Sequence, residues 1–246
     1  MRRTSADMQV AEQQELVAYL EGRAKSSASP DLARRITRML IPPSGRPPLR
    51  RLLTRAVRPY ARFRAATLAA ESTALRLNLG SAASHLPGWI NVDLLGDGAD
   101  LPWDLTRPLP FRAGSIAAIF SEHVLEHFEL PGAIALLRES RRVLSEGGLV
   151  RIGVPDAGAH LRAYCDPESQ FLQAIRPGRP TRMLAVQEVF LDDGHRSAYD
   201  FDTLKLLLGA VGFHSVKQRA FGESRLNPCP DGNHRRLGTL YVEAVR

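Results

Sequence analysis

The segment at 77–93 (LNLGSAASHLPGWINVD) constrains the fold of this chain more than any other. An apolar run stops at Gly80, small residues follow, and a second apolar run ends on Asp93. A strand that stops at a glycine lets the backbone approach a ligand, and a carboxylate ending the next strand can accept hydrogen bonds from two ribose hydroxyls. The pattern therefore predicts an α/β fold that binds a nucleotide-like cofactor.

The connection between these two strands is unusually short. The interval from Gly80 to Asp93 is less than the roughly 20 residues typical of dinucleotide-binding folds. That length leaves little room for a crossover helix. We expect a shortened turn through 85–88 (HLPG) instead.

Downstream of residue 75, strand patterns alternate with helix patterns, which indicates a mostly parallel sheet. The expected strands are 75–79, 89–92, a short one near 99–103, 116–120, 149–154, 215–220 and 239–245. The expected helices are 130–144, ended by Gly147 and Gly148, and 202–211. Upstream we expect helices at 8–23, 30–39 and 48–72, a proline-rich linker at 41–48, and an interruption of the third helix at Pro59.

Charge is distributed unevenly along the chain. Residues 1–70 contain 14 Lys and Arg against 5 Asp and Glu, although the whole chain has a net charge of only +7. This arm has few aromatic residues (Tyr60, Phe63) that could stack on bases, so a nucleic-acid partner is disfavoured. We interpret the basic residues as a solvated helical face or a surface that docks on an acidic partner. The arm could also join two copies of the chain into a homo-oligomer.

The bulk composition indicates a soluble cytoplasmic protein. No run of about 18 apolar residues exists, so no membrane span is expected. The N-terminus has two arginines but no apolar stretch behind them, which argues against a signal peptide. Cys165 and Cys229 lack metal-type spacing and are expected to be free thiols in a reducing compartment.

Four further segments carry a resemblance to a known family. They are INVDL (90–94), LPWDLTRPLPFRAGSIAAIFSEHVLEH (101–127), LLRESRRVLSEGGLVRIGVPD (136–156) and DFDTLKLLLGAVGFHSV (200–216). Together with LNLGS (77–81), they resemble class I S-adenosylmethionine-dependent methyltransferases over residues 75–246. The resemblance implies a Rossmann-like doubly wound sheet, mostly parallel with an antiparallel final strand, and S-adenosyl-L-methionine as cofactor.

The resemblance also implies a site at the carboxyl ends of four strands. The cofactor-binding residues expected from it are Asn78, Gly80 and Ser81 beside the methionine part, Asp93 at the ribose, Asp104 and Leu105 at the adenine, and Ser121 and Glu122 on the wall that faces the sulfonium. The chain departs from the family in having GSAAS in place of a loop with several glycines, and Asn78 near the position of a common acidic residue.

Three residues are candidates for catalysis. A hydroxyl acceptor needs a base within hydrogen-bond reach, and we expect His123 or His195, with Glu122 as partner or alternative. For His195 an ordinary surface-loop position is equally compatible with the sequence. The motif at 123–127 (HVLEH) also fits an inverted zinc-protease pattern, with two histidines as ligands and Glu126 as base. No third ligand is evident, so no metal is expected.

These observations predict a helical, Arg-rich extension at 1–72 and a methyltransferase domain at 73–246, in which 157–199 covers the acceptor pocket and has little regular structure of its own. The predicted activity is methyl transfer to a small-molecule or glycan acceptor, at a hydroxyl, in a biosynthetic reaction. The alternatives are an RNA or protein methyltransferase that uses the basic arm, and a non-catalytic protein that binds S-adenosylmethionine.

Overall fold

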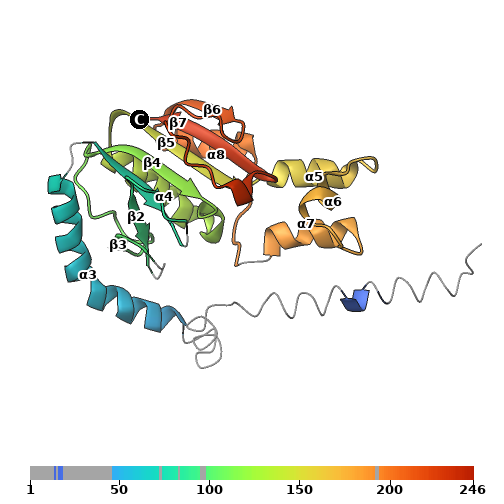
Figure 1. Cartoon of the computed structure of the whole chain (residues 1–246), viewed down its shortest axis with the longest axis horizontal. Coiled ribbons are helices and arrows are strands. Elements are labelled where there is room, and N and C mark those ends of the chain that lie inside the picture. Colours follow the sequence, from blue (N-terminus) through green and yellow to red (C-terminus); the bar gives the residue numbers. More distant parts are fainter. Residues whose placement is uncertain are drawn as a thin grey trace, which may run out of the picture.

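A single seven-stranded sheet organises the molecule, with the strand order β3-β2-β1-β4-β5-β7-β6 (Figure 1). The computed structural model describes Gln14 and residues 16–18, 46–71, 74–82, 84–94, 98–191 and 194–246. The strands are β1 (Leu75–Leu79), β2 (Ile90–Asp93), β3 (Leu101–Pro102), β4 (Ile116–Glu122), β5 (Leu144–Pro155), β6 (His214–Arg219) and β7 (Thr239–Val245). β1 to β5 pair in parallel, and β7 runs antiparallel to both of its neighbours. The expected fold class is confirmed.

The helices pack around this sheet and beyond its end. They are α3 (Arg46–Glu71), α4 (Leu130–Val143), α5 (Ala157–Cys165), α6 (Phe171–Ile175), α7 (Arg182–Leu191) and α8 (Phe201–Ala210), with short 3₁₀ helices η2 (Leu125–His127) and η3 (Asn233–Arg235). In the described part of the chain, none of these helices has the length and apolar character needed to cross a membrane. The expected helix at 30–39 and most of that at 8–23 lie outside the described residues.

The long helix α3 corrects two expectations about the basic arm. Pro47 and Pro48, expected in a linker, lie in its first turn, where a missing backbone N–H costs little. The helix continues through Pro59, so the expected interruption there is wrong. Its Ala61 and Ala65 are fully buried against the sheet domain. The C-terminal half of the helix is therefore part of the core.

The turn between β1 and β2 contains no helix among its described residues, as its length predicts. Two buried asparagines hold it. The Nδ2 group of Asn78 donates to the Ser84 carbonyl and to Oδ1 of Asn91, at 2.8 and 2.9 Å. The backbone N–H of Leu86 donates to the same Oδ1. Side-chain amides thus replace the hydrogen bonds that a crossover helix would make for itself.

The passage from α4 to β5 differs from the expectation. The helix ends at Val143, and Leu144 already pairs with β4, so Gly147 and Gly148 do not terminate the helix. Instead, Gly147 allows a turn inside the long β5 segment with a φ of 70°. Glycine adopts this left-handed conformation without the steric penalty that a side chain brings.

The two faces of the sheet are covered differently. Alternate side chains of β1, β5 and β7 pack with α3, α4 and α8 into one large apolar core that includes Leu77, Ile152, Val242, Leu137 and Leu204. The opposite face carries a smaller apolar cluster, to which no described helix contributes. There the cover is the loop at 220–238, which we call the β6–β7 loop. The helical face and the loop face are therefore built from different kinds of structure.

Residues 157–199 fold into α5, α6 and α7, so the expectation of little regular structure is wrong. These helices lie beyond the end of the sheet (Figure 1). They form an apolar cluster of their own around Leu172, Ala185 and Val186. The buried Glu188 of α7 is paired with Arg179, its Oε2 lying 2.7 Å from the Nη2 of the arginine.

Candidate active site

The expected cofactor residues lie at one edge of the sheet, because β1 to β4 are parallel and their carboxyl ends face the same way. Asp93 ends β2 and is half-buried. Its Oδ2 accepts a hydrogen bond of 3.0 Å from the backbone N–H of Ala82, in the loop after β1. The carboxylate thus joins the ends of two neighbouring strands, which is the place where open α/β folds bind ligands.

Gly80 opens the loop after β1 with a φ of 67°. A Cβ built at this position would lie 2.3 Å from Cγ2 of Val124, far inside van der Waals contact. The chain therefore needs a glycine here for its own packing, independently of any ligand. The hydroxyl of the next residue, Ser81, is buried and has no hydrogen-bond partner among the described residues. A bound polar group would satisfy it.

Asp104 and Leu105 follow β3 directly. Asp104 is buried, and its Oδ1 accepts hydrogen bonds from both the backbone N–H and the hydroxyl of Thr106. These bonds fix the orientation of the carboxylate. Leu105 packs against the main core. The turn after β3 is thus rigid, as an adenine-binding wall needs to be.

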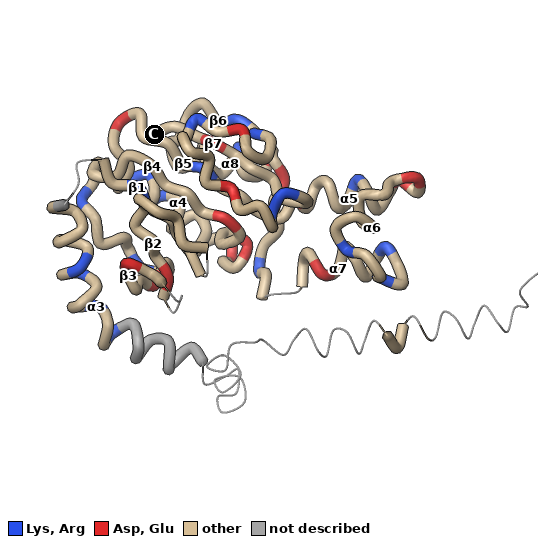
Figure 2. The backbone as a smooth tube through the Cα atoms, viewed as in Figure 1, with Lys and Arg blue, Asp and Glu red and all other residues tan. Residues whose placement is uncertain are grey.

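A partly open hollow lies beside this turn. Its lining combines the ends of β2 and β3 with the start of α3: Arg55, Val57, Arg58, Leu94, Pro102, Trp103, Asp104 and Arg107. Figure 2 shows basic residues along α3. The Nε1 group of Trp103 is buried without a hydrogen-bond partner in the described part of the chain. Three arginines, Arg55, Arg58 and Arg107, are therefore gathered at this hollow beside Asp104.

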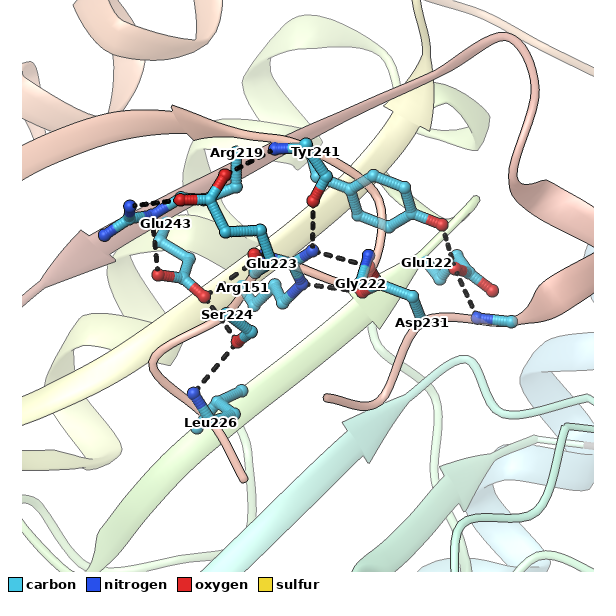
Figure 3. Close-up of polar contacts among 12 residues, drawn as sticks. Glu122, Arg151, Arg219, Gly222, Glu223, Ser224, Leu226, Asp231, Tyr241 and Glu243 are labelled. Atoms are coloured by element: carbon cyan, nitrogen blue, oxygen red, sulfur yellow. Dashed lines mark hydrogen bonds and ion pairs between the residues drawn. The ribbon is translucent and has the colours of Figure 1, made fainter. Parts of the chain in front are cut away.

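Ser121 and Glu122 end β4. Ser121 is buried and pairs with Leu79 of β1. Glu122 points to the loop face, where its Oε1 accepts hydrogen bonds from the hydroxyl of Tyr241 (2.7 Å) and the N–H of Gly232 (3.1 Å). Figure 3 shows these bonds. The Glu122 carboxylate is thus hydrogen-bonded both to the β6–β7 loop and to β7.

His123 is held in a strained and well-defined position. Its φ is 53°, in the left-handed region that costs a residue with a side chain about 1–2 kcal/mol. The Nε2 atom lies 2.9 Å from Oγ1 of Thr239, and Nδ1 lies 3.2 Å from Oε1 of Glu126. The Glu126 oxygens accept no hydrogen bond from the described residues, so the contact with Nδ1 is one of proximity alone. Strain of this kind is concentrated at functional sites.

His195 lies next to η2 rather than next to His123. Its ring makes an edge-to-face contact with that of His127, with 5.1 Å between the centroids. The neighbouring N–H groups of Arg196 and Ser197 both donate to the carbonyl of Glu126. The structure therefore brings His195 to a motif that lies far away in the sequence.

The zinc-protease geometry considered for HVLEH is absent. His123 precedes η2 in a left-handed conformation, so His123 and His127 are not successive residues on one helical face. Sequence reasoning also missed Thr239, which faces His123 from β7. No local pattern marks this threonine, because its role arises from strand pairing.

Residues 96–152 match the family described as the methyltransferase domain. The match spans β3, β4, α4 and most of β5, which carry the turn after β3 and the His123 segment. The match and the observed strand order support the resemblance to class I S-adenosylmethionine-dependent methyltransferases. The chain is a methyltransferase whose cofactor is S-adenosylmethionine.

Solved structures of low sequence identity resemble the chain. An S-adenosylmethionine-dependent methyltransferase from Archaeoglobus fulgidus is 14% identical, with a TM-score of 0.48 over 80% of this chain and 94% of that one. One from Mesorhizobium loti is 18% identical, with a TM-score of 0.43 over 70% and 90%. One from Thermotoga maritima is 16% identical, with a TM-score of 0.44 over 70% and 81%. No curated protein matches the sequence significantly.

Proposed function

We propose that the chain transfers a methyl group from S-adenosylmethionine to a hydroxyl of a small-molecule or glycan acceptor. One observation carries the choice of a hydroxyl: His123 lies at the cofactor edge of the sheet, with Nδ1 against a buried carboxylate and Nε2 against a hydroxyl. A hydroxyl is a poor nucleophile until a base takes its proton, and an imidazole oriented by a carboxylate is suited to that task.

The residues at the strand ends fit the cofactor. Asp93 and Asp104 offer carboxylates at neighbouring strands, and the buried Ser81 hydroxyl has no partner in the described chain. We assign the ribose to Asp93, the adenine to Asp104 and Leu105, and the methionine part to the loop containing Asn78, Gly80 and Ser81. Asn78 acts there through the turn that it holds, since its Nδ2 group is bonded to Ser84 and Asn91.

Methyl transfer demands alignment more than covalent help from the protein. The bound cofactor supplies an electrophilic methyl group, and the chain must place the acceptor oxygen in line with it and exclude water. We assign the base to Nε2 of His123, which exchanges its contact with Thr239 for one with the acceptor hydroxyl. The Glu126 carboxylate, whose Oε1 lies 3.2 Å from Nδ1, stabilises the imidazolium that forms. Glu122 is a positioning residue in this scheme, because it anchors the β6–β7 loop.

The test pairs two substitutions with one surface control. Asp93→Asn keeps shape but removes charge, and it should weaken S-adenosylmethionine binding by roughly tenfold or more in calorimetry, since hydrogen bonds to charged groups contribute about 1.5–3 kcal/mol. His123→Gln should retain cofactor binding but lower turnover by about 10²–10⁴-fold on a panel of hydroxylated acceptors. Asp202→Asn, at an exposed position on α8, should change neither the affinity for S-adenosylmethionine nor the turnover.

Two outcomes would contradict the proposal. Unchanged cofactor affinity in Asp93→Asn would remove the ribose assignment. Unchanged turnover in His123→Gln, or cofactor binding with no methylated product across the panel, would remove the base and favour a non-catalytic binding protein.

A second candidate function has one observation in its favour. Arg55, Arg58 and Arg107 line the hollow beside Asp104, although adenosine has no anionic group that would need them. An RNA or another anionic macromolecule would use these cations, and its affinity would fall steeply with salt. Any truncation that tests this must keep α3, because Ala61 and Ala65 are buried in the core.

A further inference from the structure

Three side chains with metal-binding atoms meet beside the end of β4. They are Glu126 and His127 of η2 and His195 of the segment after α7. One ligand atom from each lies within 4.8 Å of the other two. The backbone holds the two segments together, because the N–H groups of Arg196 and Ser197 donate to the Glu126 carbonyl at 2.8 and 3.1 Å.

Glu126 is the first reason to regard this cluster as a site. The residue is 1% exposed, and neither of its carboxylate oxygens accepts a hydrogen bond from any described residue. Nδ1 of His123 lies 3.2 Å from Oε1, outside hydrogen-bond geometry. Burying a carboxylate is costly unless it is paired, hydrogen-bonded or bound to a metal ion. One contact leaves most of the coordinating capacity of this carboxylate unused.

The orientation of His195 is the second reason. Its Nδ1 lies 2.7 Å from the carbonyl oxygen of Val189. A carbonyl only accepts, so Nδ1 carries the proton, and in the neutral ring Nε2 presents a lone pair. A backbone carbonyl on the far ring nitrogen is the arrangement that orients metal-binding histidines. The exposed His127 is the third residue of the cluster, and its ring contacts that of His195.

We propose that Glu126, His127 and His195 bind a divalent transition-metal ion. Two imidazoles and one carboxylate are a ligand set that suits Zn²⁺, and three protein ligands leave a fourth position open. His123 is not a ligand, since its two ring nitrogens face Glu126 and Thr239. The site borders the proposed base, because Oε1 of Glu126 also lies 3.2 Å from Nδ1 of His123, but ion binding is measured without any acceptor.

The experiment uses the full chain, stripped with a chelator and then titrated with Co²⁺ alone as a spectroscopic substitute for Zn²⁺. The wild type should develop the visible absorption of a four-coordinate cobalt site and should then release Co²⁺ to Zn²⁺. His127→Ala alters an exposed side chain and should lower the Co²⁺ affinity by roughly tenfold or more, as should His195→Ala. His214→Ala, an exposed histidine on β6, should bind Co²⁺ like the wild type.

A measurement of S-adenosylmethionine binding on each variant reports whether the fold is intact, so a lost metal signal cannot be confused with unfolding. The proposal fails if the wild type shows no visible cobalt band, or if folded His127→Ala and His195→Ala variants bind Co²⁺ as tightly as the wild type. Neither result would affect the assignment of Asp93.

Discussion

The helical face and the loop face of the sheet are stabilised by different interactions. Under α3, α4 and α8 the sheet buries aliphatic side chains, whose favourable free energy depends on area and little on direction. Under the β6–β7 loop it buries Arg151, which is fully inaccessible to solvent. The guanidinium Nη2 lies 2.6 Å from Oδ2 of Asp231, and Nη1 lies 3.1 Å from Oε1 of Glu243 (Figure 3).

The difference shows how a loop can take the place of a helix. A helix satisfies its own backbone groups, whereas a loop needs partners for them. Arg151 supplies such partners, since it also donates to the carbonyls of Glu223 and Ala220. Burial is the largest single influence on the pKa of Arg151 and would lower it, but the hydrogen bond and charge of Asp231, with the charges of Cys229 and Glu243, together raise it. The charge is therefore retained inside the protein.

The loop face reaches the candidate active site through Glu122 and Thr239. Glu122 binds Gly232 of the loop and the hydroxyl of Tyr241, whose pKa is raised by burial and by that carboxylate. Thr239, the first residue after the loop, faces His123. The position of the candidate base therefore depends on how the loop is held.

The largest loss of stability is expected when the buried ion pairs of Arg151 on the loop face are removed. Arg151→Ala leaves two buried carboxylates without their shared cation, and it should lower the free energy of unfolding by about 3–5 kcal/mol in urea titrations. Arg196→Ala is the matched control, because its ion pair with Glu129 is exposed and should contribute at most about 1 kcal/mol. Similar losses in the two variants would mean that burial of the pair has no special role.

The helical face should respond to loss of volume rather than of charge. Leu204→Ala removes a fully buried side chain of α8 and should cost about 2–5 kcal/mol, with little dependence on pH. Leu206→Ala on the same helix is the control, because Leu206 is 71% exposed and its loss should change stability by about 0.5 kcal/mol or less. If both variants lose the same amount in urea titrations, α8 is not packed on the sheet as described.

The smallest effect is expected at Glu139 of α4, an ion pair at the rim of the helical face. The hydrogen-bonded pair with Arg142 is the main cause that lowers the pKa of Glu139 below its ordinary 4.5. Because the folded-state pKa is depressed, this stabilisation is complete above the unfolded-state pKa and is lost as pH falls through the folded-state value. Glu139→Gln should therefore lose up to about 1 kcal/mol at neutral pH and almost nothing in acid.

Urea titrations of the wild type and Glu139→Gln at several pH values measure this difference. A loss that is the same at neutral and acid pH would show that the substitution acts through packing or through the Leu109 N–H, which donates to the same carboxylate.

Local sequence patterns were sufficient to predict much of the sheet domain. The bounds of β1 and β7 and the missing crossover helix after Gly80 follow from apolar runs, glycine and chain length, which act within a few residues. The strand-end placement of Asp93 and Asp104 follows from the same patterns, because parallel strands present their carboxyl ends at one edge. Their cofactor roles, like those of Ser121 and Leu105, stay predictions until binding is measured.

Other features depend on contacts between distant segments. Helices α5 to α7 were not evident at 157–199, because their stability comes from a shared apolar cluster around Leu172 rather than from strong local periodicity. Pro59 was expected to interrupt the helix, but packing of α3 on the core outweighs the cost of one missing hydrogen bond.

The sequence by itself determined the class of fold and the sheet edge that holds the candidate site, because strand periodicity and turn residues act locally. The cofactor followed from the resemblance to a known family. Only the tertiary structure decided that Arg151 lies under a loop, that Thr239 faces His123, and that His195 joins Glu126 and His127. Such contacts depend on how segments far apart in the chain pack together, and no periodicity within either segment records that packing.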